Sequence, residues 1–176
     1  MGGKSKQKGS EFEREICRKL SLWVTHGTQK DAFWRSAMSG GRATLGRNKG
    51  QPIRQAGDIT AVAPEGHVLT NRFYIECKFY KDLNLDSFFL MGKGTLAAHW
   101  RQVVKEAASH DKQPLLIAKQ NLKPALLVAL APVATSHNSR RLVEVSDIKC
   151  QVYLLEEVLS IKFHNMRNRL DYAKAP

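Results

Sequence analysis

Few cysteines and no long hydrophobic runs limit what this sequence can encode. Cys17, Cys77 and Cys150 are odd in number and far apart, so they predict neither a disulfide framework nor a paired zinc site. The six histidines are equally scattered. No apolar run approaches the length of a transmembrane helix, and the first residues lack the apolar core of a signal peptide. We therefore expect an intracellular, cytoplasmic protein without membrane attachment.

Acidic residues are also scarce. The chain has 16 Asp and Glu against 28 Lys and Arg, which gives a formal net charge of +12. Such an excess on one domain indicates a polyanionic partner, because neutralising phosphates releases condensed counterions. Nucleic acid is the first candidate and an anionic membrane surface is the second, and the charge alone does not separate them. The length of 176 residues suits one compact domain.

Hydrophobic periodicity predicts an α/β fold, a single domain with a mixed central β-sheet flanked by helices. A basic arm at residues 1–9 precedes the domain, residues 10–176, with a core at about 10–130 and an extension at 131–176. A helix is expected from Ser10, with Ser10 and Glu13 forming a capping box. Its apolar residues Phe12, Ile16, Leu20 and Trp23 fall on one face at helical spacing. Strands are expected at 32–37, 58–63, 73–79, 115–118, 125–130 and 142–145, and further helices at 96–110 and 154–160. The strands at 58–63 and 73–79 are predicted to pair as a hairpin.

The strongest chemical signal is an isolated Asp58 followed by Glu76 and Lys78. Residues two apart on a strand face the same side, so Glu76 and Lys78 project together while Cys77 points the other way. Two carboxylates, with the Cys77 backbone carbonyl, suit Mg²⁺, which prefers oxygen ligands. Alternating charges are usually just the solvated face of a strand. Here the neighbouring residues are strongly apolar (Phe73, Tyr74, Ile75, Phe79 and Tyr80), which favours a buried, functional group of charges.

Four motifs in order resemble the PD-(D/E)xK nucleases, and most of all the archaeal-type Holliday junction resolvases, as a phage or prokaryotic member. They are Lys8-Gly9-Ser10 with Phe12-Glu13-Arg14, Arg35-Ser36-Ala37-Met38-Ser39-Gly40, Gly57-Asp58-Ile59 and Ile75-Glu76-Cys77-Lys78. The resemblance implies a restriction-endonuclease-like core and use of Mg²⁺ (or Mn²⁺). The sequence departs from the pattern at Gly57, which replaces the proline of the family name, and beyond about residue 130, where no counterpart is visible.

The resemblance also implies roles for single residues. Asp58 and Glu76 would bind the metal with the Cys77 carbonyl, and Lys78 would position the attacking water. Glu13 matches a helix glutamate that reaches the metal through a water, although a capping-box role is compatible. Arg35 matches an arginine near the scissile phosphate, or is a charge at a strand edge. Ser39 matches a serine of the catalytic loop, or is a turn residue.

Basic residues predict the DNA contacts. The glycine-rich segment 40–57 is a long loop without an acid, and the candidates for binding phosphates are Lys8, Arg42, Arg47, Lys49 and Arg54. The N-terminal lysines could equally serve solubility. Aromatic residues do not alternate with basic ones as in a single-strand stacking platform, which disfavours an RNA-binding module. The apolar run at 88–91 is either core or a dimer surface.

These observations predict a metal-dependent endonuclease that hydrolyses DNA phosphodiesters. The resemblance implies a homodimer that cuts four-way junctions, since a two-fold symmetric dimer matches a pseudo-symmetric junction. One alternative is an endonuclease of duplex or other branched DNA, of the restriction or repair kind. An alternative of another class is a non-catalytic DNA-binding scaffold.

Overall fold

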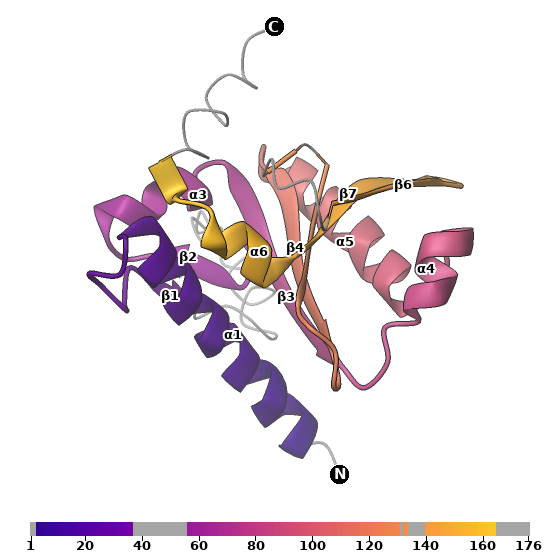
Figure 1. Cartoon of the computed structure of the whole chain (residues 1–176), viewed down its shortest axis with the longest axis horizontal. Helices are drawn as coiled ribbons and strands as arrows, with labels where there is room; N and C mark the ends of the chain where they lie inside the picture. Colours follow the sequence, from indigo (N-terminus) through magenta and orange to yellow (C-terminus); the bar gives the residue numbers. More distant parts are fainter. Residues whose placement is uncertain (1–2, 37–55, 131, 134–139, 165–176) are drawn as a thin grey trace, which may run out of the picture.

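The computed structural model describes residues 3–36, 56–130, 132–133 and 140–164 of the chain. Its centre is a five-stranded mixed sheet (Figure 1). The strand order is β3 (Phe73–Tyr80), β4 (Gln113–Gln120), β5 (Leu126–Ala129), β7 (Ile148–Leu154) and β6 (Arg141–Val145). β3 and β4 are parallel and all other neighbours are antiparallel. The predicted mixed α/β fold is confirmed.

Helices cover both faces of this sheet (Figure 1). On one face, α1 (Gly3–Val24) and α6 (Leu155–Ser160) pack against the sheet in a first hydrophobic core. On the other face, α4 (Leu85–Met91) and α5 (Thr95–Ser109) form a second core. The two parallel strands β3 and β4 are joined through α4 and α5, as expected, because parallel neighbours need a crossover connection.

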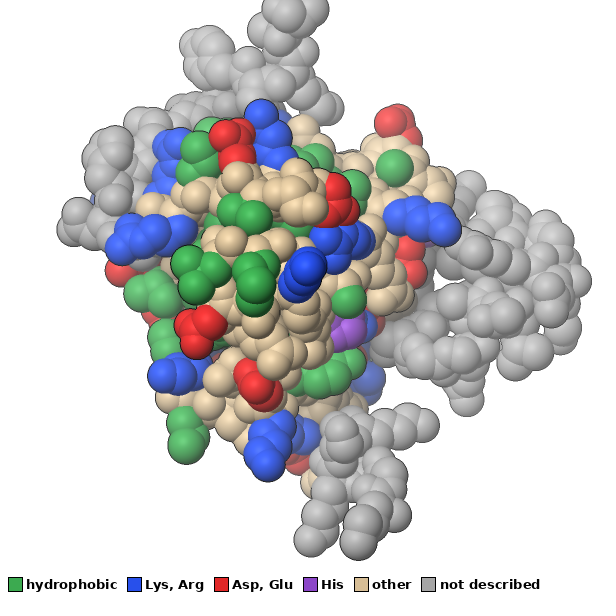
Figure 2. Space-filling model, turned by 90° about the vertical axis from the view of Figure 1, so that its right-hand side faces the viewer, with side chains coloured by type: hydrophobic (Ala, Val, Ile, Leu, Met, Phe, Trp, Pro, Cys, Tyr) green, Lys and Arg blue, Asp and Glu red, His purple; other side chains and the backbone are tan. Residues whose placement is uncertain are grey.

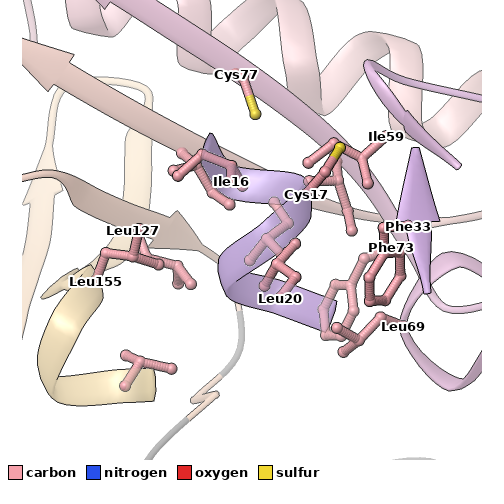
Figure 3. Close-up of a cluster of buried hydrophobic side chains, with 14 of the residues drawn as sticks. Ile16, Cys17, Leu20, Phe33, Ile59, Leu69, Phe73, Cys77, Leu127 and Leu155 are labelled. Carbon is pink, nitrogen blue, oxygen red and sulfur yellow. The ribbon is translucent and has the colours of Figure 1, made fainter. Parts of the chain in front are cut away.

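Figure 3 shows the core on the α1 side. Ile16, Cys17 and Leu20 of α1 lie among side chains from the sheet and from the short strand β1 (Phe33–Arg35). Cys77 of β3 points into this core, whereas Tyr74 of the same strand packs in the core on the α5 side. The alternation along β3 therefore directs odd-numbered and even-numbered side chains to opposite faces of the sheet.

The first helix is longer than the sequence predicted. α1 begins at Gly3, so the backbone of residues 3–9, expected as an arm, forms its first turns, and Ser10 is an interior residue rather than an N-cap. Because Glu13 then lies well inside the helix, the predicted capping box is wrong. The apolar residues Phe12, Ile16 and Leu20 nevertheless form the buried stripe that their spacing predicted.

The predicted hairpin is also wrong. β2 (Ile59–Ala61) pairs antiparallel with β1 in a separate two-stranded sheet, while β3 pairs with β4. The segment between β2 and β3 is not a tight turn, since it contains the 3-10 helix η1 (Pro64–Gly66) and the helix α3 (His67–Thr70). Among the described residues, an isolated parallel bridge between Gly57 and Ile75 pairs the start of the β2 region with β3.

Two further elements, β7 and α4, were not predicted. In β7, Ile148, Cys150 and Val152 enter the core on the α5 side, a period-2 pattern that the sequence contained. α4 contains the apolar run at 88–91, in which Phe88 is fully buried and Leu90 is 76% exposed.

Figure 2 shows the surface of the molecule from the right-hand side of Figure 1. Hydrophobic side chains on this face lie in small groups between charged ones. No helix in the described ranges has the length and apolar character needed to span a membrane.

Candidate active site

Glu76 and Lys78 lie side by side on β3, the outermost strand of the five-stranded sheet. The Lys78 Nζ donates to Glu76 Oε1 at 2.6 Å. Glu76 is buried, at 7% exposed, although β3 is an edge strand. The predicted alternation holds, because Cys77 between them packs against α1. A carboxylate and an ammonium group are thus held in contact on a strand whose residues 73–77 are buried.

Asp58 is fixed against the free edge of the same strand. Its backbone N–H donates to the Ile75 carbonyl at 2.8 Å, and its own carbonyl accepts the N–H of Ser36 at 2.8 Å. Its side chain turns to β3 as well, where Oδ2 accepts the N–H of Cys77 at 2.9 Å. Backbone and side-chain bonds therefore both place this carboxylate beside Glu76, without the hairpin that the sequence suggested.

Gly57 explains how the chain comes so close to β3. A Cβ at this position would lie 2.4 Å from the Ile75 carbonyl oxygen, and the residue has φ +85°. Proline, whose ring fixes φ at about −65°, does not adopt this conformation. The departure from the proline of the family name is therefore required by the backbone geometry of this protein.

Glu13 and Arg35 complete the group from two other elements. Glu13 on α1 accepts a hydrogen bond at Oε2 from Nε of Arg35 on β1. Both charges act on Asp58, where Glu13 raises and Arg35 lowers the pKa of the carboxyl group. The structure therefore brings together five of the predicted catalytic side chains: Glu13, Arg35, Asp58, Glu76 and Lys78.

The electrostatics of the two central acids are unfavourable in the protein alone. Burial is the main cause that raises the pKa of Glu76 to about 7, and the Asp58 charge raises it further against the opposing effect of Lys78. Burial also raises the pKa of Asp58, while the bond from Cys77 N–H opposes the increase. Two buried carboxylates that repel each other would be stabilised by a cation between them.

The donor set fits a hard divalent cation. Asp58 and Glu76 offer carboxylate oxygens. The N–H of Cys77 points to Asp58 at the free edge, and in a strand the N–H and C=O of one residue point to the same side, so the Cys77 carbonyl also faces this edge. In the described part of the chain, no three His, Cys, Asp or Glu side chains form a metal-binding group. Any remaining ligands would be backbone oxygens, water or substrate, as is common for Mg²⁺.

Of the predicted DNA-binding residues, the structure describes Lys8. It lies on the α1 side of β3, with its Nζ 4.0 Å from the ring centroid of Phe79 and bonded to the side chain of Asn121. The other predicted DNA-binding residues lie outside the described residues: Arg42, Arg47, Lys49 and Arg54. So does Ser39, which was predicted to be catalytic.

A polar face of α5 adjoins the site. Its residues His99, Gln102 and Glu106 recur at helical spacing next to the buried residues of this helix. The sequence pointed to Gln102, which resembles a helix glutamine of related nucleases, but not to the other two. The charge of Glu106 raises the pKa of Glu76, and burial, followed by the charge of Lys78, lowers the pKa of His99. The spacing was a visible signal, but nothing in the sequence indicated that β3 would lie beneath this face.

Comparison with known proteins agrees with this arrangement. A family model described as "Phage putative PDDEXK endonuclease" matches residues 4–171, nearly the whole chain. The protein belongs to this family of phage PDDEXK endonucleases. No curated protein and no solved structure matches the chain. Nucleases of this superfamily generally use divalent metals.

Proposed function

We propose that the protein is a DNA endonuclease that uses Mg²⁺ (or Mn²⁺) held by Asp58, Glu76 and the Cys77 carbonyl. One observation carries the proposal: two buried, mutually repelling carboxylates lie at the edge of β3 with Lys78 bonded to one of them. A structural role would not require this repulsion, whereas a cation and a phosphate would relieve it. The net charge of +12 supports DNA as the substrate.

The chemistry follows from the positions of these side chains. A metal held by these oxygens would neutralise charge on the scissile phosphate and lower the pKa of a bound water. Lys78 would orient the attacking water, whose oxygen bonds to phosphorus as one phosphorus–oxygen ester bond of the DNA backbone breaks. The water gives up a proton to the solvent and the leaving oxygen takes one from the solvent, so the products are a phosphate monoester end and a hydroxyl end. Glu13 would hold a further water toward the metal, and Arg35, fixed by Glu13, would stabilise the charge that develops on the phosphate.

For the substrate we propose branched DNA, and in particular four-way junctions cut by a homodimer. The symmetry argument supports this, because an isologous dimer presents two equivalent active sites to two strands. Leu90 and Met91 of α4 and Leu142 of β6 are at least half exposed and would be covered in such a dimer.

The test is cleavage of a labelled four-way junction and of a linear duplex of equal length, with Mg²⁺, Mn²⁺ or EDTA. Paired symmetric nicks that depend on metal and on Glu76 would support the full proposal. Equal cutting of both substrates would retain the endonuclease and remove the junction preference. Tight binding without any cutting would replace the enzyme with a DNA-binding scaffold.

A further inference from the structure

A groove beside the active site carries an exposed tryptophan among basic residues. Its cavity, about 340 Å³, lies between α1 and β1 and is lined by Arg14, Arg18, Lys30, Asp31, Trp34 and Arg35, among others. Trp34 is 61% exposed, whereas Trp100 is 2% exposed. The indole N–H of Trp23 is bonded to the Ile161 carbonyl. Trp34 is thus the tryptophan whose ring is available to a ligand.

The groove has a charge suited to an anion. Arg14 and Arg18 lie one turn apart on the exposed side of α1, an arrangement in which like charges repel each other. Arg14, Arg18 and Lys30 form no ion pair with another described residue. Against them stands one acid of the lining, Asp31, while Arg35 is already paired with Glu13. Phosphate groups would relieve the repulsion among the cations.

The groove adjoins the candidate active site through Arg35, which lines the groove and donates a hydrogen bond to Glu13. The N–H of the next residue, Ser36, is bonded to the Asp58 carbonyl. If the scissile phosphate lies beside Asp58, the neighbouring nucleotides of the same DNA would therefore come close to Trp34. The position of the scissile phosphate rests on the proposed function, whereas the groove is defined by its lining residues alone.

We propose that this groove binds an unpaired nucleotide of a branched DNA substrate, with the base stacked on Trp34 and its phosphates on Arg14, Arg18 and Lys30. In a duplex the faces of the bases are covered by their neighbours, so an exposed indole finds a free face only on an unpaired base. The fold supplies the basic and aromatic combination that the sequence lacked, because α1 and β1 contribute its parts separately.

The experiment measures equilibrium binding in EDTA, so that no DNA is cut. The probes are a linear duplex, a fully paired four-way junction and the same junction with unpaired thymidines at the crossover. Trp34→Ala should weaken binding of the third probe by about tenfold and leave the first two unchanged. Trp34→Phe, which keeps a stacking ring, should recover most of the affinity. The matched control Leu130→Ala, at an exposed apolar residue directly after β5, should change none of the three.

Two further measurements sharpen the result. Binding of the third probe should quench the tryptophan fluorescence of the wild type and have much less effect in Trp34→Phe. The Arg14→Gln, Arg18→Gln double variant should weaken all three probes and reduce the salt dependence of binding. Equal loss for paired and unpaired probes in Trp34→Ala, or no loss at all, would overturn the proposal.

Failure of the two proposals can be told apart. If the wild type cuts DNA in a metal-dependent way but Trp34→Ala does not distinguish the probes, the groove assignment is wrong and the nuclease stands. If Trp34→Ala weakens binding of the unpaired probe alone, but the wild type cuts no DNA with either metal, the groove assignment stands and the nuclease proposal is wrong.

Discussion

Charged side chains lie in opposite environments at the two edges of the five-stranded sheet. At the β3 edge, Asp58 and Glu76 are buried, repel each other, and have raised pKa values. At the β6 edge, Glu144 is paired with Lys149 at 3.0 Å with both side chains exposed. Near it, the Arg101 guanidinium lowers the pKa of the exposed Asp147 to about 2.

This difference shows where the fold retains unfavourable electrostatics. Exposed pairs of opposite charge contribute little to stability, because water screens their interaction. Buried like charges destabilise the protein until a cation binds, and such strained groups concentrate at functional sites. Substitution of a charged residue at the β3 edge should therefore reduce activity most and stability least.

Removal of one central carboxylate should have the largest effect. Glu76→Gln and Asp58→Asn are each expected to reduce DNA cleavage at least about a thousandfold, because a metal ligand is lost, while DNA binding in EDTA survives. The measurement is the single-turnover rate of cleavage with saturating enzyme. The matched variant Glu144→Gln at the β6 edge should cut at the wild-type rate, and wild-type rates in Glu76→Gln would remove the site assignment.

Lys78 should follow closely. Lys78→Ala is expected to reduce the cleavage rate by about 10²–10³-fold with little change in metal affinity, since it removes a group that acts on the water and on the developing charge. Lys149→Ala removes an exposed lysine from the opposite edge and should be silent. A Lys78 variant that loses metal binding instead, measured by calorimetry with Mn²⁺, would mean that this lysine mainly organises Glu76.

Part of this site was predictable from sequence and part was not. The period-2 pattern of β3 correctly separated Glu76 and Lys78 from Cys77, and the spacing on α1 correctly gave its buried stripe. These are local patterns, which depend only on strand and helix geometry. Residue order also identified Asp58, as an isolated acid before the acid-x-Lys strand, whereas Glu13 was identified through a resemblance alone.

What failed was non-local. The hairpin between 58–63 and 73–79 was inferred from two adjacent strand patterns, yet β2 pairs with β1 across the segment 37–55 that the structure does not describe. The groove around Trp34 was missed for the same reason, because its cations come from α1 and its ring from β1. Sequence spacing cannot show which helix face will lie beside which strand.

Gly57 offers a smaller test with an internal control. Gly57→Ala places a Cβ 2.4 Å from the Ile75 carbonyl oxygen, and should lower the free energy of unfolding by about 1–3 kcal/mol and reduce cleavage by displacing Asp58. Gly27 has φ +88° but nothing within 4 Å of its Cβ position. Gly27→Ala should therefore cost only about 1–2 kcal/mol for the left-handed backbone and leave cleavage intact. Equal activity of the two variants would show that Asp58 is not held by this contact.

The smallest effect concerns pH and metal-free stability. The folded pKa of Glu76, about 7, lies above its ordinary value of 4.5, so its contribution favours folding below about pH 4.5 and is lost as pH rises through about 7. Asp147 behaves oppositely: its stabilising contribution is complete above 3.8 and is lost as pH falls through about 2. Of these two groups, therefore, Glu76 is the one whose titration changes the stability between about pH 5 and pH 9.

Because other charges also titrate over this range, the informative quantity is the difference between wild type and Glu76→Gln. Without metal, the wild type should lose about 1–3 kcal/mol relative to the variant from about pH 5 to pH 9, which is several degrees in Tm. Added Mg²⁺ should reverse this loss at pH 9 and do little at pH 5, since the ligand must be deprotonated to bind. Thermal melts in EDTA and in Mg²⁺ measure both effects. Parallel curves for the two proteins would mean that Glu76 is ionised throughout, and that Lys78 rather than a metal compensates its charge.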